Sequence, residues 1–264
     1  MILYVLVAVL AAGLSLPVDN HYENRGFLYT RQQILNRLCL VSVFLLLFLV
    51  SALRLNVGND YAKYVEFMHL IRSNAMVPTE FGFNWVVKIL YGISGFENYL
   101  LVFAVFAFAT IYLFLKAIYQ QADSFPFSFF LFMALGYYFQ TFNTVRYYLA
   151  LSIALFAIPY VLRKEWVKFI LLILLGATMH KSLLVVIPLY FLASRCWKKW
   201  QLVLAALFCS TFFFLQDFYL RLVVFLYPPY EDTEYLEGGT SMINILRCAA
   251  VLVLALLCYK KCVK

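Results

Sequence analysis

Charged side chains are scarce in this chain of 264 residues. Asp, Glu, Lys and Arg make up 13% of it, whereas hydrophobic residues make up 65%. A soluble domain carries roughly 25% charged residues. The composition therefore excludes such a domain, and with it a soluble basic surface that would use the net charge of +8 to bind nucleic acid. The sequence predicts an integral membrane protein without a nucleic-acid partner.

Residue patterns that hold metals or nucleotides are also absent. The six cysteines are scattered, and only Cys258 and Cys262 lie close together, which gives neither a disulfide framework nor a zinc site. His21 and His69 have no partners at metal-binding spacing. There is no Gly-rich phosphate loop, no Gly-x-Ser-x-Gly nucleophile elbow and no acidic pair typical of metal-dependent sugar-nucleotide transferases. We therefore expect no metal, no cofactor and no nucleotide substrate.

The long apolar runs predict an all-α fold, a polytopic transmembrane helical bundle. Short polar segments join them, and they lack the alternation of barrel strands. Residues 2–17 count as the first span because no basic segment precedes them, as a signal peptide would require. Against the roughly 20 residues of a full crossing, about nine spans are predicted in a single membrane domain, residues 1–264: 2–17, 34–53, 99–117, 125–142, 146–162, 166–180, 183–195, 200–217 and 242–259.

The distribution of Lys and Arg predicts the orientation. With the N-terminus outside and the C-terminus cytoplasmic, most of the 21 basic residues fall in cytoplasmic joints and the opposite side is close to neutral. Two external loops follow, residues 54–98 and 218–241. The first contains a mixed, helix-like stretch at 64–71 and an apolar segment at 81–93 that is too short to cross unaided, so it is expected to be re-entrant.

Two polar breaks interrupt the apolar block of residues 125–194, at 143–146 and at 180–182. Ionisable side chains at a membrane helix centre cost about 2.5 to 3.5 kcal/mol on insertion scales and are presumed functional by default. The predicted orientation places both breaks on the extracytoplasmic side. They therefore indicate a working site at the outer face of the membrane.

The second break has two interpretations. As a helix, residues 166–180 would rise only about 22 Å against a hydrocarbon core of about 30 Å. The tip would then stop below the surface, where His180, Lys181 and Ser182 should face a water-filled cavity, because polar backbone at that depth needs one. Alternatively, the helices begin deeper in the basic joint, the tip reaches the interface, and Lys181 extends to water.

The first break predicts an anion site. Asn143 and Arg146 are three residues apart, so at the start of a helix they would project from one face, which Tyr147 continues. A guanidinium binds phosphate oxygens in two-point fashion, and a helix N-terminus adds free amide donors, so the pair suits a pyrophosphate. Alternatively, Arg146 is an interfacial arginine paired with an external acid such as Asp60 or Glu80.

Four other ionisable residues are candidates for this site. Arg221 and Arg247 lie towards the outer side and are expected to join the cluster, although both are also compatible with mobile interfacial arginines. Asp60 and Glu80 occupy turn-like settings close to the membrane face and would orient a sugar hydroxyl. Their alternative role is structural, as a turn cap or a salt bridge to Arg146.

In these segments the chain resembles the EpsG-type, Wzy-like polysaccharide polymerases of bacterial membranes. The resemblance runs from Asp60 to about the final span and depends on the order, spacing and shared membrane side of several short motifs. They are Asn59-Asp60-Tyr61 with Tyr64, Glu80-Phe81-Gly82-Phe83, Asn143-Thr144-Val145-Arg146-Tyr147-Tyr148-Leu149-Ala150, His180-Lys181-Ser182 and Gly238-Gly239. Relative to the family the chain ends early, soon after Cys258, so we expect one or more terminal spans to be absent.

The resemblance implies an activity and partners. Such proteins join oligosaccharide repeat units carried on undecaprenyl pyrophosphate into exopolysaccharide, capsule or O-antigen, at the outer face of the bacterial cytoplasmic (inner) membrane. The expected partners are these lipid-linked oligosaccharides, membrane lipid, and the chain-length regulator and flippase of the same pathway. The alternatives are a flippase or transporter of lipid-linked oligosaccharide and a non-catalytic membrane partner of a glycan assembly complex. A flippase needs access from both sides, whereas the polar residues here gather toward one.

The resemblance also implies roles for the candidate residues. Arg146, helped by Arg247 or Lys181, would stabilise the leaving pyrophosphate. His180 would be the general base on the acceptor hydroxyl, with Asp60 or Glu80 as the rival base. The remaining candidates would bind substrate: Asn143, Tyr147, Ser182, Arg221, Tyr61 and Tyr64.

Overall fold

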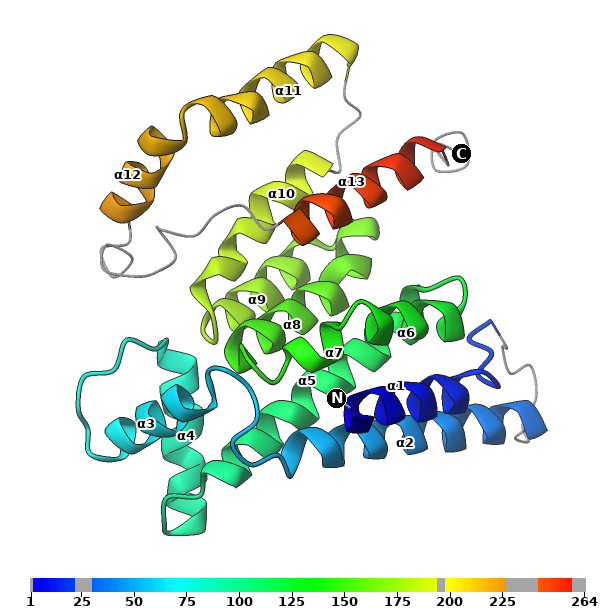
Figure 1. Ribbon diagram of the computed structural model, residues 1–264, viewed down its shortest axis with the longest axis vertical. Coiled ribbons are helices and arrows are strands. Elements are labelled where there is room, and N and C mark those ends of the chain that lie inside the picture. The colour runs from blue at the N-terminus through cyan, green and yellow to red at the C-terminus, as the bar shows by residue number, and fades with distance from the viewer. Residues whose placement is uncertain (1, 22–29, 194–197, 227–241, 258–264) are drawn as a thin grey trace. The chain divides into compact units, whose positions relative to one another are not determined.

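The computed structural model describes residues 2–21, 30–193, 198–226 and 242–257, and all regular secondary structure in these ranges is helical. The predicted all-α class is therefore confirmed. Internal contacts divide the chain into two compact units, residues 1–195 and 196–264, which are described separately. Figure 1 labels their helices.

The first unit contains ten α-helices and one 3₁₀ helix among its described residues. They are α1 (Ile2–Ser15), α2 (Arg31–Ala52), α3 (Tyr61–Arg72), α4 (Phe81–Ser94), α5 (Tyr99–Gln121), α6 (Phe125–Ala134), α7 (Tyr137–Gln140), α8 (Val145–Leu162), α9 (Trp166–Ala177), η1 (Lys181–Val185) and α10 (Val186–Ala193). In the second unit the helices are α11 (Lys199–Phe214), α12 (Gln216–Leu226) and α13 (Met242–Leu257).

Three of the described helices, α2, α5 and α8, are long and apolar enough to cross a membrane. The prediction of 125–142 as one continuous helix is wrong, because Gly136 adopts a left-handed conformation, with φ of +78°, and separates α6 from α7. The predicted span at 200–217 likewise divides after Phe214. That nine segments cross the membrane, and in the stated orientation, stays a prediction.

The long helix α5 is the centre of the first unit. It packs against α2 on one side and α8 on the other, α8 packs in turn against α9, and α1 lies along α2 and α6 (Figure 1). Phe103 and Phe106 of α5 are almost completely buried in this core. Leu45 and Leu49 of α2 are instead exposed on the outer surface, as expected of helices that face lipid tails.

The predicted external loop 54–98 is largely helical. The expected helix-like stretch lies within α3, and the short apolar segment forms α4. Tyr64 and Met68 of α3 and Phe83 of α4 pack with the first half of α5 in one buried cluster. The beginning of α4 also contacts the end of α9, where the Gly82 amide donates to the Thr178 carbonyl oxygen at 2.9 Å. This contact joins the 54–98 segment to the end of α9.

Candidate functional site

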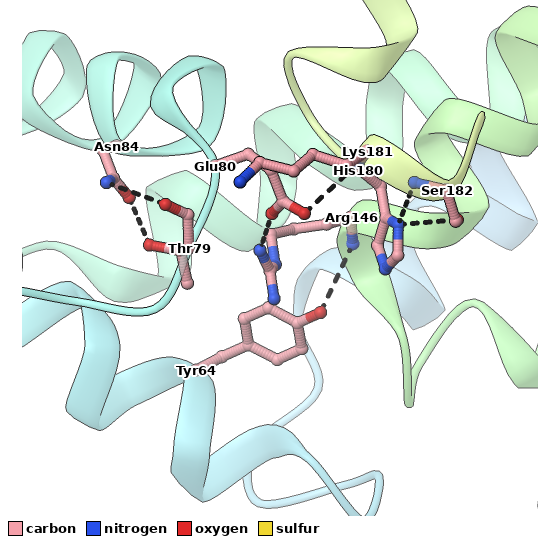
Figure 2. A network of polar contacts seen from close by, with 8 residues as sticks. All are labelled: Tyr64, Thr79, Glu80, Asn84, Arg146, His180, Lys181 and Ser182. Atoms are coloured by element: carbon pink, nitrogen blue, oxygen red, sulfur yellow. Dashed lines mark hydrogen bonds and ion pairs between the residues drawn. The ribbon is translucent and has the colours of Figure 1, made fainter. Parts of the chain in front are cut away.

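One end of the first unit gathers the polar residues that interrupt the apolar sequence (Figure 2). Arg146 lies in the first turn of α8, His180 in the turn between α9 and η1, and Glu80 directly before α4. Glu80 contacts both of the other segments, across sequence separations of 66 and 101 residues. The two breaks in the apolar block therefore come together through a third segment.

The carboxylate of Glu80 bridges the two breaks. Its Oε2 forms an ion pair with Arg146 Nη1, and its Oε1 accepts a hydrogen bond from the backbone amide of Lys181 at 3.2 Å. The exposed fraction is 9% for the Glu80 side chain and 14% for Arg146, so the pair is shielded from water. Of the two interpretations of Arg146, the one in which it pairs with an acid such as Glu80 describes this contact. The pairing also leaves Glu80 poorly placed to act as a free base.

Arg146 keeps hydrogen-bonding capacity beyond this ion pair. A guanidinium has five N–H donors, and Arg146 Nε is buried without a hydrogen-bond partner among the described residues. The guanidinium carbon lies 5.7 Å from the ring centroid of Tyr64 and 5.5 Å from that of Phe83, which restricts its movement by cation–π contact. The site thus holds a fixed cation, and its Nε is covered by protein without an acceptor among the described residues.

The hydrogen bonds of His180 determine which ring nitrogen carries its proton. Nδ1 accepts from the backbone amide of Ser182 at 3.4 Å and contacts the Ser182 hydroxyl at 2.8 Å. Because an amide can only donate, Nδ1 is unprotonated in this arrangement, and a neutral ring carries its hydrogen on Nε2. Such a ring donates from Nε2. To act as a base there, it would need the opposite tautomer and would lose the amide bond.

The surroundings of His180 keep the ring neutral. Burial lowers the pKa of His180, which lies in the turn outside the helices; the nearby Glu80 carboxylate raises it and Arg146 lowers it, both less strongly. The ring of Tyr147 contacts the imidazole edge-on, with centroids 5.4 Å apart. Tyr147, Lys181 and Ser182 are all exposed, so this part of the site is accessible from outside the helix bundle.

Asn143 has a different position from the predicted one. It lies in the turn before α8, which begins at Val145, so it does not share a helix face with Arg146. Its Oδ1 accepts from the Asn59 amide at 3.0 Å and so fixes the turn that precedes α3. Gly58 in that turn has φ of +107°, and a Cβ there would lie 2.5 Å from the carbonyl oxygen of Phe142. The turn before α3 and the turn before α8 are therefore packed closely against each other, and the contact involves the Phe142 backbone and the Asn143 side chain.

The residues of α3 form the wall behind Arg146. The hydroxyl of Tyr64 accepts from the backbone amide of Arg146 at 3.5 Å, and the Tyr61 ring stacks on Phe103 with centroids 5.0 Å apart. Both tyrosines are buried. Asp60 precedes α3 by one residue, is half-buried, and makes no side-chain capping hydrogen bond, contrary to the alternative prediction of a turn cap. Its carboxylate forms no ion pair with any described residue.

Arg54 is a buried cation that the sequence pattern did not single out. Its guanidinium carbon lies 5.0 Å from the ring centroid of Phe103 and 4.9 Å from that of Phe142, and Nη1 donates to the Ser51 hydroxyl at 3.3 Å. Burial lowers its pKa to about 10, so it stays protonated at neutral pH. Its position directly after a predicted span was the available signal. Arg54 adds positive charge beside Phe142, the residue before Asn143.

Two of the predicted residues lie in the second unit. Arg221 is exposed on α12, and Arg247 belongs to α13. That they join the Arg146 cluster stays a prediction, and Gly238, Gly239 and the acids at 231–237 lie outside the described residues. Within the described ranges, no three His, Cys, Asp or Glu side chains are grouped to hold a metal ion. Metal independence also stays a prediction.

The close contact between α4 and the His180 turn depends on a glycine. A Cβ on Gly82 would lie 2.7 Å from the carbonyl oxygen of Thr178 and would overlap its hydroxyl as well. A backbone carbonyl cannot move aside without displacing the turn that it belongs to. Gly82 therefore allows Glu80, two residues earlier, to reach both Arg146 and the Lys181 amide.

We expect Gly82→Ala to destabilise the protein by about 1–3 kcal/mol, the usual cost of overpacking, and to reduce activity by separating Glu80 from its partners. Gly92→Ala is a matched control in the same helix, because no described atom beyond its chain neighbours and the backbone of its own helix lies within 4 Å of the position that its new methyl group would take. Alanine should stabilise that position by up to about 1 kcal/mol. Thermal unfolding in detergent compares the two variants. Equal stability of both would contradict the close-packing argument.

The site residues all fall within a region shared with a known family. A family model described as EpsG family matches residues 37–264. This range includes every candidate site residue. No curated protein and no solved structure matches the chain.

Proposed function

Because the chain belongs to the EpsG family, the family of Wzy-like polysaccharide polymerases, we propose that it joins lipid-linked oligosaccharide repeat units into a longer glycan. The carrier lipid would be undecaprenyl pyrophosphate, and the product an exopolysaccharide, capsule or O-antigen. The reaction would take place at the outer face of the bacterial cytoplasmic membrane. The long apolar helices and the family support a membrane polymerase in general.

One observation carries the finer proposal. Arg146 and His180 come from separate breaks in the apolar sequence, and Glu80 holds both segments together. Arg146 has a buried Nε without a partner among the described residues, and His180 has its hydrogen on Nε2. A fixed guanidinium charge beside a fixed imidazole donor suits a pyrophosphate that gains charge as it leaves.

The proposed reaction is a single glycosyl transfer. The bond between the anomeric carbon of the growing chain and the pyrophosphate oxygen breaks, and both bonding electrons leave with the pyrophosphate. A hydroxyl oxygen of the second lipid-linked unit forms the new bond to that carbon, and its proton passes to a base. Arg146 and His180 stabilise the leaving group.

Asp60 is the proposed base, because the other two candidates are engaged elsewhere. Glu80 is already shared between Arg146 and the Lys181 amide, and His180 carries a proton on the nitrogen that faces away from Ser182. The Asp60 carboxylate caps no amide and is half-buried, one helical turn before Tyr64, whose hydroxyl contacts the first turn of α8. A carboxylate in this position can take the proton of a hydroxyl within hydrogen-bond reach.

The test is reconstitution. The purified full chain in liposomes, supplied with synthetic undecaprenyl-pyrophosphate-linked repeat units, should produce a ladder of longer glycans, detected by mass spectrometry. Asp60→Asn should reduce the ladder strongly without changing the stability of the protein. Movement of the lipid-linked unit across the bilayer without elongation would contradict the proposal and support a flippase. Absence of both would support a non-catalytic partner.

A further inference from the structure

A second feature of the first unit is an apolar cavity of about 410 Å³ between α5, α6, α7, α8 and α10. Leu151, Ala154 and Leu155 of α8 form one wall, and Val186 and Tyr190 form another. Among the described residues no charged side chain lines it, and its polar groups are the hydroxyls of a serine and two tyrosines. Its volume lies within the range of about 300–1,000 Å³ that is usual for ligand pockets.

The cavity lies next to the polar site along two of its walls. Leu151 follows Tyr147 by four residues, so it lies about 6 Å, slightly more than one helical turn, further along the same face of α8. Tyr147 contacts His180 edge-on. On the other wall, Val186 directly follows η1, which begins with Lys181 and Ser182. An apolar cavity therefore starts about one turn from a cluster of anion-binding groups.

This juxtaposition fits an amphiphile with an anionic head group and a hydrocarbon tail. We propose that the cavity holds the tail segment nearest the pyrophosphate of a polyprenyl carrier lipid, with the head group at Arg146 and His180. The proposal rests on the proposed function for the identity of the head group. The uncharged lining that the described residues form favours a hydrocarbon occupant over a sugar, which would need hydrogen-bond partners.

The physical role of such a cavity differs from that of an apolar pocket in water. A lipid tail is already in hydrocarbon, so transfer into the cavity gives little hydrophobic gain, and packing against the walls decides the selectivity. The branched, unsaturated tail of a polyprenyl lipid and a straight acyl chain fill a rigid cavity differently. We therefore expect the cavity to select the carrier by tail shape and to orient its pyrophosphate toward Arg146.

Ser128→Phe tests the cavity by filling it from α6, where Ser128 is a small, half-buried lining residue. In the reconstituted elongation assay, we expect it to raise KM for the undecaprenyl donor by about tenfold, the scale on which hydrophobic pockets discriminate. A donor whose pyrophosphate carries a methyl group in place of the polyprenyl tail leaves the cavity empty, so it should be used equally by the variant and the unchanged protein. Val105→Phe, on the exposed outer face of α5, is the matched control and should change neither.

A second measurement does not depend on turnover. Undecaprenyl pyrophosphate with a photoactivatable group in its first isoprene unit should label peptides of α8 and α10, and Ser128→Phe should reduce that labelling. If labelling occurs without elongation, the cavity proposal stands and the proposed function fails. Labelling spread evenly over the exposed helix faces, or equal use of all tail types by both proteins, would show that bulk lipid fills the cavity and would overturn the inference.

Discussion

Arg146→Ala should reduce glycan elongation by about 100- to 1,000-fold, the loss that follows removal of one preorganised donor to a developing oxyanion. The guanidinium is fixed between the Tyr64 and Phe83 rings and is held by Glu80, so it needs little reorganisation when the pyrophosphate leaves. Arg146→Lys keeps the charge but loses the planar fork, and it should recover only part of the rate. The rate is measured as the disappearance of single lipid-linked units in liposomes.

A purely structural role for Arg146 predicts a different pattern. Removing one partner of a buried ion pair costs about 3–5 kcal/mol because the other charge stays buried, so Arg146→Ala also threatens folding. The exchange of both residues, Glu80→Arg with Arg146→Glu, separates the two effects because it rebuilds the ion pair with its charges reversed. We expect the exchange to recover part of the stability in thermal unfolding, since an arginine at position 80 cannot accept from the Lys181 amide, without recovering elongation. Recovery of both would contradict a role in binding pyrophosphate.

Much of the helical architecture could be predicted because apolar length and polar joints are local properties. The helices α2, α5 and α8 begin and end within a few residues of the predicted spans. The break at Gly136 could not, because only its left-handed conformation distinguishes it from a glycine inside a helix. Sequence periodicity contains no such backbone information.

The site was only partly predictable, for a similar reason. Scarcity of charge in apolar sequence selects Arg146 and His180 as unusual, but it does not say what they contact. Glu80 reaches Arg146 across 66 residues and the Lys181 amide across 101. These contacts depend on the packing of α4 against α9, which the absence of a side chain on Gly82 allows. Composition and spacing left Glu80 with a role on the substrate hydroxyl or a structural role as the partner of Arg146. The three-dimensional packing favours the ion pair with Arg146.

His180→Gln and His180→Asn should differ by at least about tenfold in rate. The glutamine amide nitrogen occupies nearly the position of His180 Nε2 and can donate, whereas the shorter asparagine places its nitrogen near Nδ1 and cannot reach the same ligand. If His180 donates from Nε2, as its bonds to Ser182 indicate, glutamine should keep most of the activity, and asparagine should lose about 100-fold. If His180 is the general base, both variants should lose about 10²- to 10⁴-fold, because neither amide takes up a proton.

The pH dependence gives an independent test of the same assignment. Burial lowers the pKa of His180 from the usual value of about 6.5. A base works only when unprotonated, so its contribution would be lost as the pH falls through that lowered pKa. A donor works in both protonation states, because the protonated ring still carries hydrogen on Nε2. We therefore expect kcat of the unchanged protein and of His180→Gln to change in parallel as the pH falls through that range. A loss of kcat in the unchanged protein that is absent from His180→Gln would show that His180 is the base.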